Sequence, residues 1–524
     1  MKFLRAAIFA VLFLNVSAPQ ALAEDVTLTS RDGSVKIVGT LVGYDGEFYR
    51  VDTEYGVLTI DGSGVLCDGP GCPDLQAFVA EFSISGARTM GEVLMPALVE
   101  TFAQRNGYSI ARNIIDDTHF GYVLTDIASE RVAARIGFRV TSTAEGFADL
   151  LAGEADIVLS TRQANPSEIR IGQEAGIGDL TNPRRSRIIA LDAMVPIVAR
   201  GNRLDGLTFE ELSKIYSGEI ANWASLGGPD APIALHLRGV QSGLSDEFKR
   251  RVMLPFKAAM IPAVTRHASN ADLSRAVGRD PFSIGMAALS ELGNARPVPI
   301  KGVCGKVLVA NEMSLKTEDY PLTAPLFIYT PARRLSVLAR EFLSFARSPA
   351  AQGVVQRAGF IDLRLDAIPV DHQGQRLANA ITAAGDETSI EDLQRMVQRM
   401  HGTARLALSF RFEPGGIKLD AQSRSNIEIL AQQLERGVYD EHTLIFAGFS
   451  DGVGAADVNL RLAKRRAESV RRAVLRAAPT VDRDRLDLQI DAFGEAMPMA
   501  CDDSDWGRSV NRRVEVWETM GVPN

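Results

Sequence analysis

Several residue types that define whole classes of protein are scarce in this chain. Its 524 residues include only 4 cysteines, 6 histidines and 3 tryptophans. The cysteines and histidines form no C-x-x-C pair and no H-E-x-x-H stretch, so the sequence gives no support for a structural or hydrolytic zinc site. We therefore expect neither a metal nor a cofactor.

The chain also lacks an excess of positively charged residues. The chain carries 57 Lys and Arg against 65 Asp and Glu, a formal net charge of −8. Non-specific nucleic-acid binding needs a positive field that neutralises phosphates, so this balance argues against nucleic acid as a partner. Hydrophobic residues at 46% and charged residues at 23% are typical of globular domains. At about 150 residues per domain, the length suggests three or four of them.

Long apolar runs are lacking beyond the N-terminus. Lys2 and Arg5 precede an apolar run over residues 6–16, and a small-x-small site ends at Ala23. This pattern predicts a secretory signal peptide over residues 1–23, cleaved after Ala23. The run is too short to span a bilayer, and no later stretch reaches the roughly 18 uninterrupted apolar residues that a membrane-crossing helix needs. We expect an exported protein.

The cysteines fall into two groups. Cys67 and Cys72 flank the turn-forming sequence Asp-Gly-Pro-Gly, and an even number of cysteines in an oxidising compartment favours pairing. We predict a disulfide between these two. Cys304 and Cys501 lie in different predicted domains, and their pairing is left open.

Turn signals and hydrophobic periodicity divide the exported chain. Residues 24–75 contain short alternating segments between Asp-Gly turns, which predicts a small β-barrel module of unknown role. Residues 76–364 alternate strand and helix patterns, which predicts a two-lobed α/β fold with helices on both faces of a largely parallel sheet. Residues 365–401 are interpreted as a linker with one amphipathic helix. Residues 402–520 predict a compact α+β unit.

Four turns in residues 76–364 have the composition of an anion site. They occupy residues 85–89, 141–146, 160–162 and 238–245 and are rich in Gly, Ser, Thr and Arg. A dehydrated phosphate or sulfate needs many donors, which backbone N–H groups at helix N-termini, hydroxyls and a guanidinium supply. Glycine lets the backbone approach the anion closely.

The order of these turns resembles the periplasmic phosphate-binding proteins of ABC transporters over most of residues 80–364. The most specific stretch is residues 206–223, and residues 285–287 and 350–360 also fit that family. The resemblance implies a hinged periplasmic-binding-protein fold of type II that closes on phosphate or a related oxyanion. The anion-binding residues that it implies are Arg88, Thr89, Met90, Ser142, Thr143, Thr161, Arg238, Ser242 and Gly243.

Two positions depart from the pattern of that family. Thr161 stands where its phosphate receptors present a carboxylate that accepts the proton of the ligand, and Leu244 replaces a second hydroxyl. Both changes weaken the case for phosphate over another anion. Arg88 and Arg162 either add positive charge to the site or are ordinary solvated surface arginines. Trp223 is interpreted as a core or hinge-packing residue.

Residues 402–520 resemble the OmpA-like peptidoglycan-binding domain over nearly their full length. The motifs that carry the resemblance are residues 410–415, 448–454, 459–467 and 507–516. In that family an aspartate and an arginine clamp the zwitterionic end of diaminopimelate in the stem peptide. The matching residues are Asp451 and Arg466, with Asn459 ordering the loop against the helix.

Three features of this unit allow other interpretations. The arginines of residues 465–476 form a basic helix face, which is more typical of a solvated face than of a nucleic-acid site. Residues 511–513 are interpreted as structural pairing rather than ligand contact. Residues 448–452 fit G-x-S-x-G, a hydrolase motif that needs a histidine after its serine, and no histidine follows Ser450. No enzymatic activity is predicted.

The sequence thus predicts an exported solute-binding protein for phosphate or a related oxyanion, tethered non-covalently to peptidoglycan. Its expected place is the periplasm of a Gram-negative-type bacterium, and the side of the cell wall, inner or outer membrane, is left open. An inner-membrane ABC permease is a further partner that the resemblance implies. The first alternative is a structural or sensor protein of the envelope whose receptor lobes do not serve transport. An envelope hydrolase is a second and weaker alternative.

Overall fold

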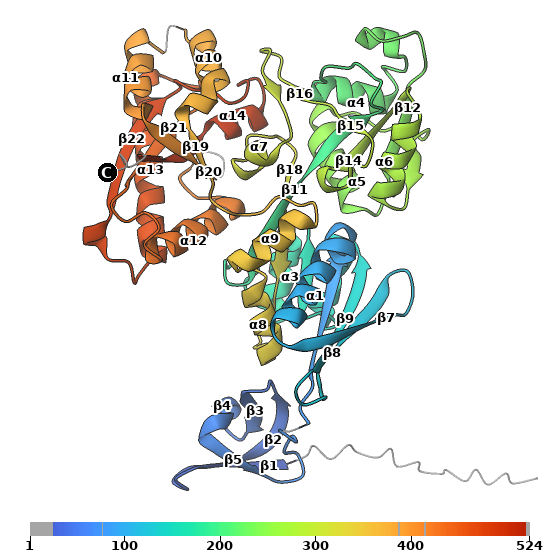
Figure 1. Ribbon diagram of the computed structural model, residues 1–524, viewed down its shortest axis with the longest axis vertical. Coiled ribbons are helices and arrows are strands. Elements are labelled where there is room, and N and C mark those ends of the chain that lie inside the picture. Colours follow the sequence, from blue (N-terminus) through green and yellow to red (C-terminus); the bar gives the residue numbers. More distant parts are fainter. Residues whose placement is uncertain (1–24, 76, 386–387, 413–415, 520–524) are drawn as a thin grey trace, which may run out of the picture. The chain divides into compact units, whose positions relative to one another are not determined.

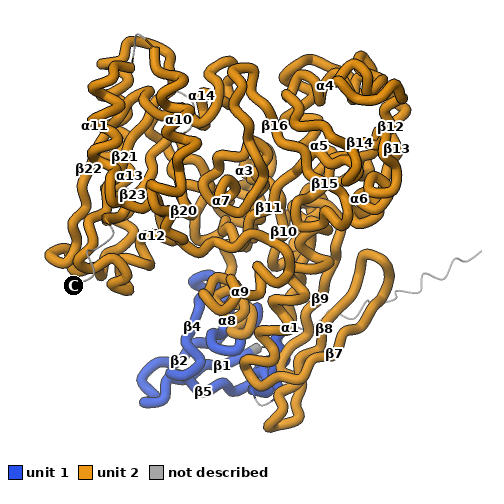
Figure 2. The backbone as a smooth tube through the Cα atoms, turned by 45° about the horizontal axis from the view of Figure 1, so that its top comes forward, with its two compact units in different colours: residues 1–80 blue, residues 81–524 orange. Residues whose placement is uncertain are grey.

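The computed structural model describes residues 25–75, 77–385, 388–412 and 416–519, and the chain divides into two units at residue 80 (Figure 2). The predicted signal peptide lies outside the described residues, as do residues 413–415 of the first C-terminal motif. None of the helices in the described ranges combines the length and the apolar character that a bilayer crossing requires.

The first unit, residues 1–80, is an antiparallel sheet of five strands in the order β4-β3-β2-β1-β5. Its strands are β1 (Asp25–Ser30), β2 (Lys36–Tyr44), β3 (Phe48–Thr53), β4 (Gly56–Asp61) and β5 (Val65–Asp68). The predicted strands are therefore present. The predicted barrel is not shown, because β4 and β5 lie at opposite ends of the sheet and do not pair in the described residues.

The disulfide of this unit reinforces a small core. The core consists of four buried residues, Val26, Leu28, Tyr49 and Val51. Cys67 and Cys72 pack against it, and their predicted disulfide is present with a Cα–Cα distance of 5.8 Å. A core of this size stabilises a domain weakly, and a cross-link restricts the unfolded chain. The disulfide is therefore a main source of stability for the unit.

The second unit, residues 81–524, contains a long mixed sheet in the order β13-β12-β14-β11-β18-β10-β6-β9-β8-β7. Its strands are β6 (Ala80–Ala87), β7 (Tyr108–Ile114), β8 (His119–Asp126), β9 (Val132–Thr141), β10 (Ile157–Ser160), β11 (Ser186–Val198), β12 (Ala234–Arg238), β13 (Thr265–His267), β14 (Ser283–Ala288) and β18 (Thr323–Tyr329). The expectation of a largely parallel sheet is wrong. Hairpins join β7, β8 and β9, and β11 pairs with β14 and β18 in the antiparallel sense.

Two strands connect the two lobes of this sheet. β11 pairs with β18 through residues 186–193 and with β14 through residues 194–198, so it runs from one lobe into the other. The first lobe carries α1 (Met95–Arg105), α2 (Thr143–Ala152), α3 (Pro166–Glu174), α8 (Val337–Phe345) and α9 (Pro349–Arg357) (Figure 1). The second lobe carries α4 (Phe209–Ser217), α5 (Gly243–Phe248), α6 (Asn270–Arg279) and α7 (Glu312–Lys316). Trp223 is buried in the core of the second lobe, which confirms its interpretation as a core residue.

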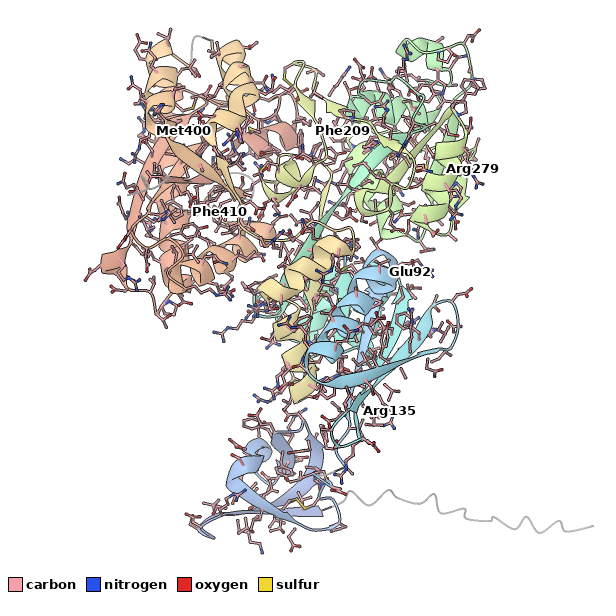
Figure 3. All side chains as sticks on the ribbon, in the orientation of Figure 1. Glu92, Arg135, Phe209, Arg279, Met400 and Phe410 are labelled. Carbon is pink, nitrogen blue, oxygen red and sulfur yellow. A yellow bond between two sulfur atoms is a disulfide. The ribbon has the colours of Figure 1, made fainter. Side chains whose placement is uncertain are left out.

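The C-terminal domain is a five-stranded sheet in the order β19-β20-β23-β21-β22 with a helical layer on each face. Its elements are β19 (Ala367–Pro369), β20 (Thr403–Arg411), β21 (Thr443–Phe449), β22 (Asp487–Gly494), β23 (Arg513–Thr519), α10 (Gly374–Ala383), α11 (Ile390–Met400), α12 (Ala421–Glu435), α13 (Ala456–Ala477) and α14 (Asp505–Asn511). Phe410 belongs to the core under α12 and α13, and Met400 to the core under α10 and α11 (Figure 3). Residues 365–401 therefore complete this domain rather than link to it.

A disulfide and a buried ionic cluster join the second lobe to the C-terminal domain. Cys304, in the loop between β16 (Ile300–Lys301) and β17 (Val307–Leu308), is bonded to Cys501. Asp319 forms ion pairs with Arg405 at 3.1 Å and with Arg411 at 3.0 Å. Burial raises the pKa of the Asp319 carboxyl, but the two arginines more than offset this and hold it below its usual value.

Candidate functional site

A cavity of about 500 Å³ lies where turns of the two lobes converge. Its walls come from the turns after β6, β9 and β10 in the first lobe and after β12 and β13 in the second. All of the predicted anion-binding residues except Met90 line it. The structure thus brings together residues that are up to about 150 positions apart in the sequence, as the resemblance implied.

The turn after β6 offers a hydroxyl and a partly neutralised cation. Thr89 lines the cavity at the start of the helical segment Met90–Leu94, which leads into α1. Met90 is fully buried, so its backbone N–H is the only group that it can present. Arg88 donates from Nη1 to Glu92 Oε1 at 2.7 Å, and Figure 3 marks Glu92 on the first lobe. This carboxylate offsets part of the charge that Arg88 brings.

The turn between β9 and α2 presents two hydroxyls at a helix N-terminus. Ser142 is the N-cap residue of α2, and its Oγ accepts a hydrogen bond from the backbone N–H of Glu145 at 3.2 Å. The buried Thr143 Oγ1 accepts from the backbone N–H of Thr161 at 3.2 Å and lies 3.4 Å from Thr161 Oγ1. The positive end of the helix and these hydroxyls favour a negatively charged ligand.

Arg238, the last residue of β12, brings a buried positive charge to the cavity. The residue is 7% exposed, and its Nε has no hydrogen-bond partner among the described residues. Burial lowers the pKa of Arg238, and the carboxylates of Glu291 and Glu92 oppose this shift. A buried guanidinium without a full set of partners is unfavourable, so an anion that enters the cavity stabilises it.

The turn after β12 brings the second lobe close to the first. Ser242 is the N-cap residue of α5, and its Oγ accepts from the backbone N–H of Ser245 at 3.2 Å. Gly243 begins α5, and a methyl group at this position would lie 2.9 Å from Thr161 Oγ1 of the first lobe. The absence of a side chain at Gly243 therefore allows the two walls of the cavity to approach each other.

Sequence reasoning missed three polar residues that also line the cavity outside the four predicted turns, namely Thr118, His267 and Asn270. His267 ends β13, and Asn270 begins α6 after the N-cap residue Ser269. This is the strand–turn–helix pattern of the predicted turns, so residues 267–270 carried a usable signal. Thr118 lies in the loop between β7 and β8 and carried none.

His267 does not add a positive charge to the cavity. Its Nε2 lies 2.9 Å from Nδ1 of His236, and Nε2 of His236 lies 3.1 Å from Ser283 Oγ. Burial lowers the pKa of both imidazoles. Burial therefore disfavours a positive charge on either ring.

Arg162 does not contribute to this cavity either. Its guanidinium forms two hydrogen bonds with Glu168, from Nη1 to Oε2 at 2.9 Å and from Nη2 to Oε1 at 2.8 Å. Glu168 is held in turn by the capping box at the start of α3. Arg162 lines a different cavity, of about 790 Å³. The interpretation of Arg162 as an added charge in the anion site is wrong, because a local carboxylate neutralises it.

One cluster of carboxylates has the spacing of a cation site, but a lysine occupies its centre. Glu312, Asp362 and Asp366 have carboxylate oxygens close to one another. Lys316 Nζ lies 2.9 Å from Glu312 and Asp362 and 2.5 Å from Asp366. The ammonium group already supplies the positive charge that a metal ion would provide.

The second candidate site lies in the C-terminal domain, in the loop after β21. Asp451 is 8% exposed, and its Oδ2 accepts a hydrogen bond from Arg512 Nη1 at 2.5 Å. The structural interpretation of residues 511–513 fits Asn511 and Arg513, which are fully buried and bound within the domain. Arg512 is also paired within the domain, since it binds the predicted ligand-binding carboxylate of Asp451, and its Nε has no partner in the described residues.

Arg466, on α13, is the predicted partner for a carboxylate of the ligand. It is 1% exposed, and its Nε and Nη2 each lie 3.4 Å from the backbone oxygen of Gly416. Its Nη1 has no partner in the part of the chain that is described. Burial and the like charge of Arg512 lower the pKa of Arg466 to about 10, and Asp451 opposes the shift. Arg466 thus shares one electrostatic environment with Asp451 and retains a donor for an anionic group.

Asn459 connects the loop of Asp451 to α13. Its Nδ2 donates to the backbone oxygens of Asp451 and Val453, both at 3.2 Å. It also donates to Glu495 Oε1 at 2.6 Å. These are the hydrogen bonds that the predicted ordering role requires.

Fold and sites together define a class of protein. Two lobes joined by paired strands, with hydroxyls, helix N-termini and a buried arginine between them, form a periplasmic-binding-protein-like domain of type II. The α+β domain that follows, with its Asp and Arg in one cluster, is OmpA-like. The chain belongs to the PBP superfamily, whose domain model matches residues 76–350, and the OmpA family model matches residues 411–512.

The first domain is similar to several known proteins. The protein SphX of Synechococcus elongatus is 25% identical over 272 residues, which cover 48% of this chain and 78% of SphX. The phosphate-binding protein PstS of Borreliella burgdorferi is 24% identical and aligns with 40% of this chain and 72% of its own. The crystal structure of an ABC-type phosphate transport receptor from Vibrio cholerae is 20% identical, covers 53% of this chain and 99% of that chain, and has a TM-score of 0.40.

Proposed function

We propose that this chain is an exported receptor for phosphate or a closely related oxyanion, held non-covalently to peptidoglycan by its C-terminal domain. The observation that carries the proposal is Arg238, a buried guanidinium with an unpartnered Nε among the described residues, on the wall of a cavity lined by hydroxyls and helix N-termini. The name of the relative PstS supports phosphate as the first ligand to test. Because Thr161 and Leu244 depart from the pattern of phosphate receptors, sulfate is the second ligand to test.

Wall binding rests on charge complementarity in the C-terminal domain. Diaminopimelate in a stem peptide ends in an ammonium group beside a carboxylate. Asp451 offers a carboxylate for the first group, and Nη1 of Arg466, which has no partner among the described residues, offers a donor for the second. Arg512, which already binds Asp451, holds that carboxylate in place for the ligand.

The location and the division of labour are part of this proposal. A signal peptide over residues 1–23 directs the chain to the periplasm, where residues 76–364 bind the anion and residues 402–520 bind the wall. Residues 365–401 pack on the wall-binding domain. An inner-membrane ABC permease would receive the anion, and neither site is proposed to catalyse a reaction.

Calorimetry on the full chain tests the receptor. Phosphate, then sulfate, is titrated into the wild type and into Arg238→Ala. Loss of a buried, charge-assisted contact should weaken binding by about 100-fold. Arg275→Ala, an exposed arginine of the same lobe that pairs with Asp272, is the matched control and should bind as the wild type does. Saturable binding that Arg238→Ala leaves intact, or no binding of either anion, contradicts the proposal.

Cosedimentation with isolated sacculi tests the wall site. Asp451→Ala and Arg466→Ala should each release the protein, because each leaves one charge of the bound zwitterion without its partner. Arg461→Ala is the control, since Arg461 is an exposed arginine of the same helix that pairs with Asp457. If both site variants cosediment with sacculi as the wild type does, Asp451 and Arg466 are not the wall-binding residues.

One observation favours a second candidate function, that of an envelope sensor. The Cys304–Cys501 disulfide and the Asp319 ion pairs fix the receptor's second lobe to the domain that would hold the wall. Movement of the lobes would then reach the wall-bound domain. A sensor predicts that saturating phosphate changes the affinity for sacculi, whereas a receptor that only delivers its anion predicts no change.

A further inference from the structure

Arginines gather where the first lobe meets the C-terminal domain, and neither site described above uses them. Two cavities, of about 320 and 190 Å³, share Arg187 and Arg347 in their walls. We refer to both together as the arginine pocket. The other arginines that line it are Arg184, Arg185, Arg340, Arg364 and Arg436.

Carboxylates neutralise few of these charges. Arg364 is paired with Asp362 at 2.9 Å. By contrast, Arg187 donates from Nε to the backbone oxygen of Arg184 at 3.3 Å, and Arg185 donates from Nη1 to the backbone oxygen of Pro331. In the described ranges, no ion pair engages Arg184, Arg185, Arg187, Arg347 or Arg436.

The electrostatics of the pocket disfavour its own positive charge. Burial, together with the like charges of Arg347 and Arg184, lowers the pKa of Arg187 to about 10 against the opposing effect of Glu428. Burial also lowers the pKa of Arg347, again against Glu428. Like charges gathered in a partly buried cavity raise the free energy of the folded chain unless a counter-charge enters.

The size and lining of the pocket indicate what the counter-charge is. One guanidinium group can bind two oxygens of a phosphate-type group at once. Each of the two cavities is lined by arginines besides the shared Arg187 and Arg347. Apolar side chains, among them Ile188, Leu363 and Ile429, line the larger cavity between the charges. We propose that the arginine pocket, a site separate from the cavity at Arg238, binds an anion with at least two phosphate-type groups, either a free diphosphate or a bisphosphorylated headgroup.

Pyrophosphate is the probe for this site in the full chain. In the Arg238→Ala chain, anion binding to the cavity between the lobes is weakened. Calorimetry on this chain should find one pyrophosphate bound per chain. Adding Arg187→Gln and Arg347→Gln should weaken this binding by about 100-fold, since both cavities lose their shared donors. The matched control adds Arg170→Gln and Arg275→Gln, two exposed arginines whose removal changes the net charge equally. It should change the affinity less than about 2-fold.

A folding control accompanies the variants. Because glutamine removes charges that repel each other, Arg187→Gln with Arg347→Gln should not lower the unfolding temperature. If that variant does not fold, Arg436→Gln at the exposed end of α12 is the second test, with an expected loss of about 10-fold.

Vesicles separate the two sources of the ligand. Flotation with phosphatidylcholine vesicles that carry phosphatidylinositol 4,5-bisphosphate, compared with phosphatidylcholine alone, tests the headgroup. Capture that Arg187→Gln with Arg347→Gln abolishes identifies a headgroup site, whereas binding of soluble pyrophosphate alone identifies a free anion. Binding of neither probe, or an equal loss in the matched control, overturns the proposal.

Discussion

Replacing Asp319 by alanine should weaken the junction between the second lobe and the C-terminal domain. Its Oδ1 lies 3.0 Å from Arg411 Nη2 and its Oδ2 lies 3.1 Å from Arg405 Nη1. All three side chains are almost completely buried. The substitution therefore leaves two guanidinium groups in the junction without the carboxylate that lies between them.

The contacts that remain set the size of the effect. Removing one partner of a buried ion pair costs about 3–5 kcal/mol. Arg405 keeps Glu515 Oε1 at 3.4 Å, whereas the acceptors that Arg411 keeps in the described residues are uncharged, among them the backbone oxygens of Val510 and Thr317. The carboxyls of Asp420 and Glu318 still attract Arg411, so the expected loss lies near the lower bound, at about 3 kcal/mol.

Urea unfolding of the full chain measures this loss. The experiment is made in a Cys304→Ser, Cys501→Ser background, because the disulfide otherwise keeps the two parts together. Asp319→Ala should shift the midpoint of the C-terminal domain, and a single transition should separate into two. Glu210→Ala, which removes only an exposed pair with Lys214, is the control. A loss below about 1 kcal/mol for Asp319→Ala would refute the reasoning, since a buried cation would then tolerate isolation.

Two further predictions concern the hinge and the anion cavity. Burial raises the pKa of Asp192, in the hinge strand β11, to about 6 against hydrogen bonds from Ser290 and Ala193. The contribution of neutral Asp192 to the free energy of unfolding is therefore complete below about pH 4 and is lost as the pH rises through about 6. Asp192→Asn should remove up to ~3 kcal/mol of this change with pH in thermal unfolding. An Asp192→Asn chain whose stability varies with pH as the wild type does would contradict the prediction. Gly243→Ala should weaken anion binding about 10-fold, because overpacking against Thr161 costs about 1–3 kcal/mol. Calorimetry checks this, and wild-type affinity would show that the two walls need not approach.

The anion-binding turns could be predicted because each is a local pattern. Ser142 and Ser242 each stand one residue before a helix, and N-capping depends on a few neighbouring residues. The charge state of an arginine does not follow from such a pattern. The sequence left the role of Arg162 open, because its partner Glu168 is fixed by the capping box of the next helix, a contact that only the folded turn creates.

The contacts that the sequence did not predict are mainly those between residues far apart along the chain. Cys304 and Cys501 are 197 positions apart, and Asp451 and Arg512 are 61 apart, so neither contact leaves a local trace. The role of residues 365–401 was missed for a related reason. An amphipathic helix shows that it buries one face, but the surface that covers this face, here the second side of the C-terminal sheet, is known only from the fold.

The place of the arginine pocket links it to the cavity at Arg238. Arg187 belongs to the first lobe, whereas Arg436 belongs to the C-terminal domain, which the Cys304–Cys501 disulfide fixes to the second lobe. A rotation of the lobes about β11 and β18 therefore changes the distance across the pocket together with the width of the cavity. If each ligand prefers one spacing of the lobes, each must change the affinity of the other by the same factor. The junction between the second lobe and the C-terminal domain would then couple the two anion sites without any contact between the ligands.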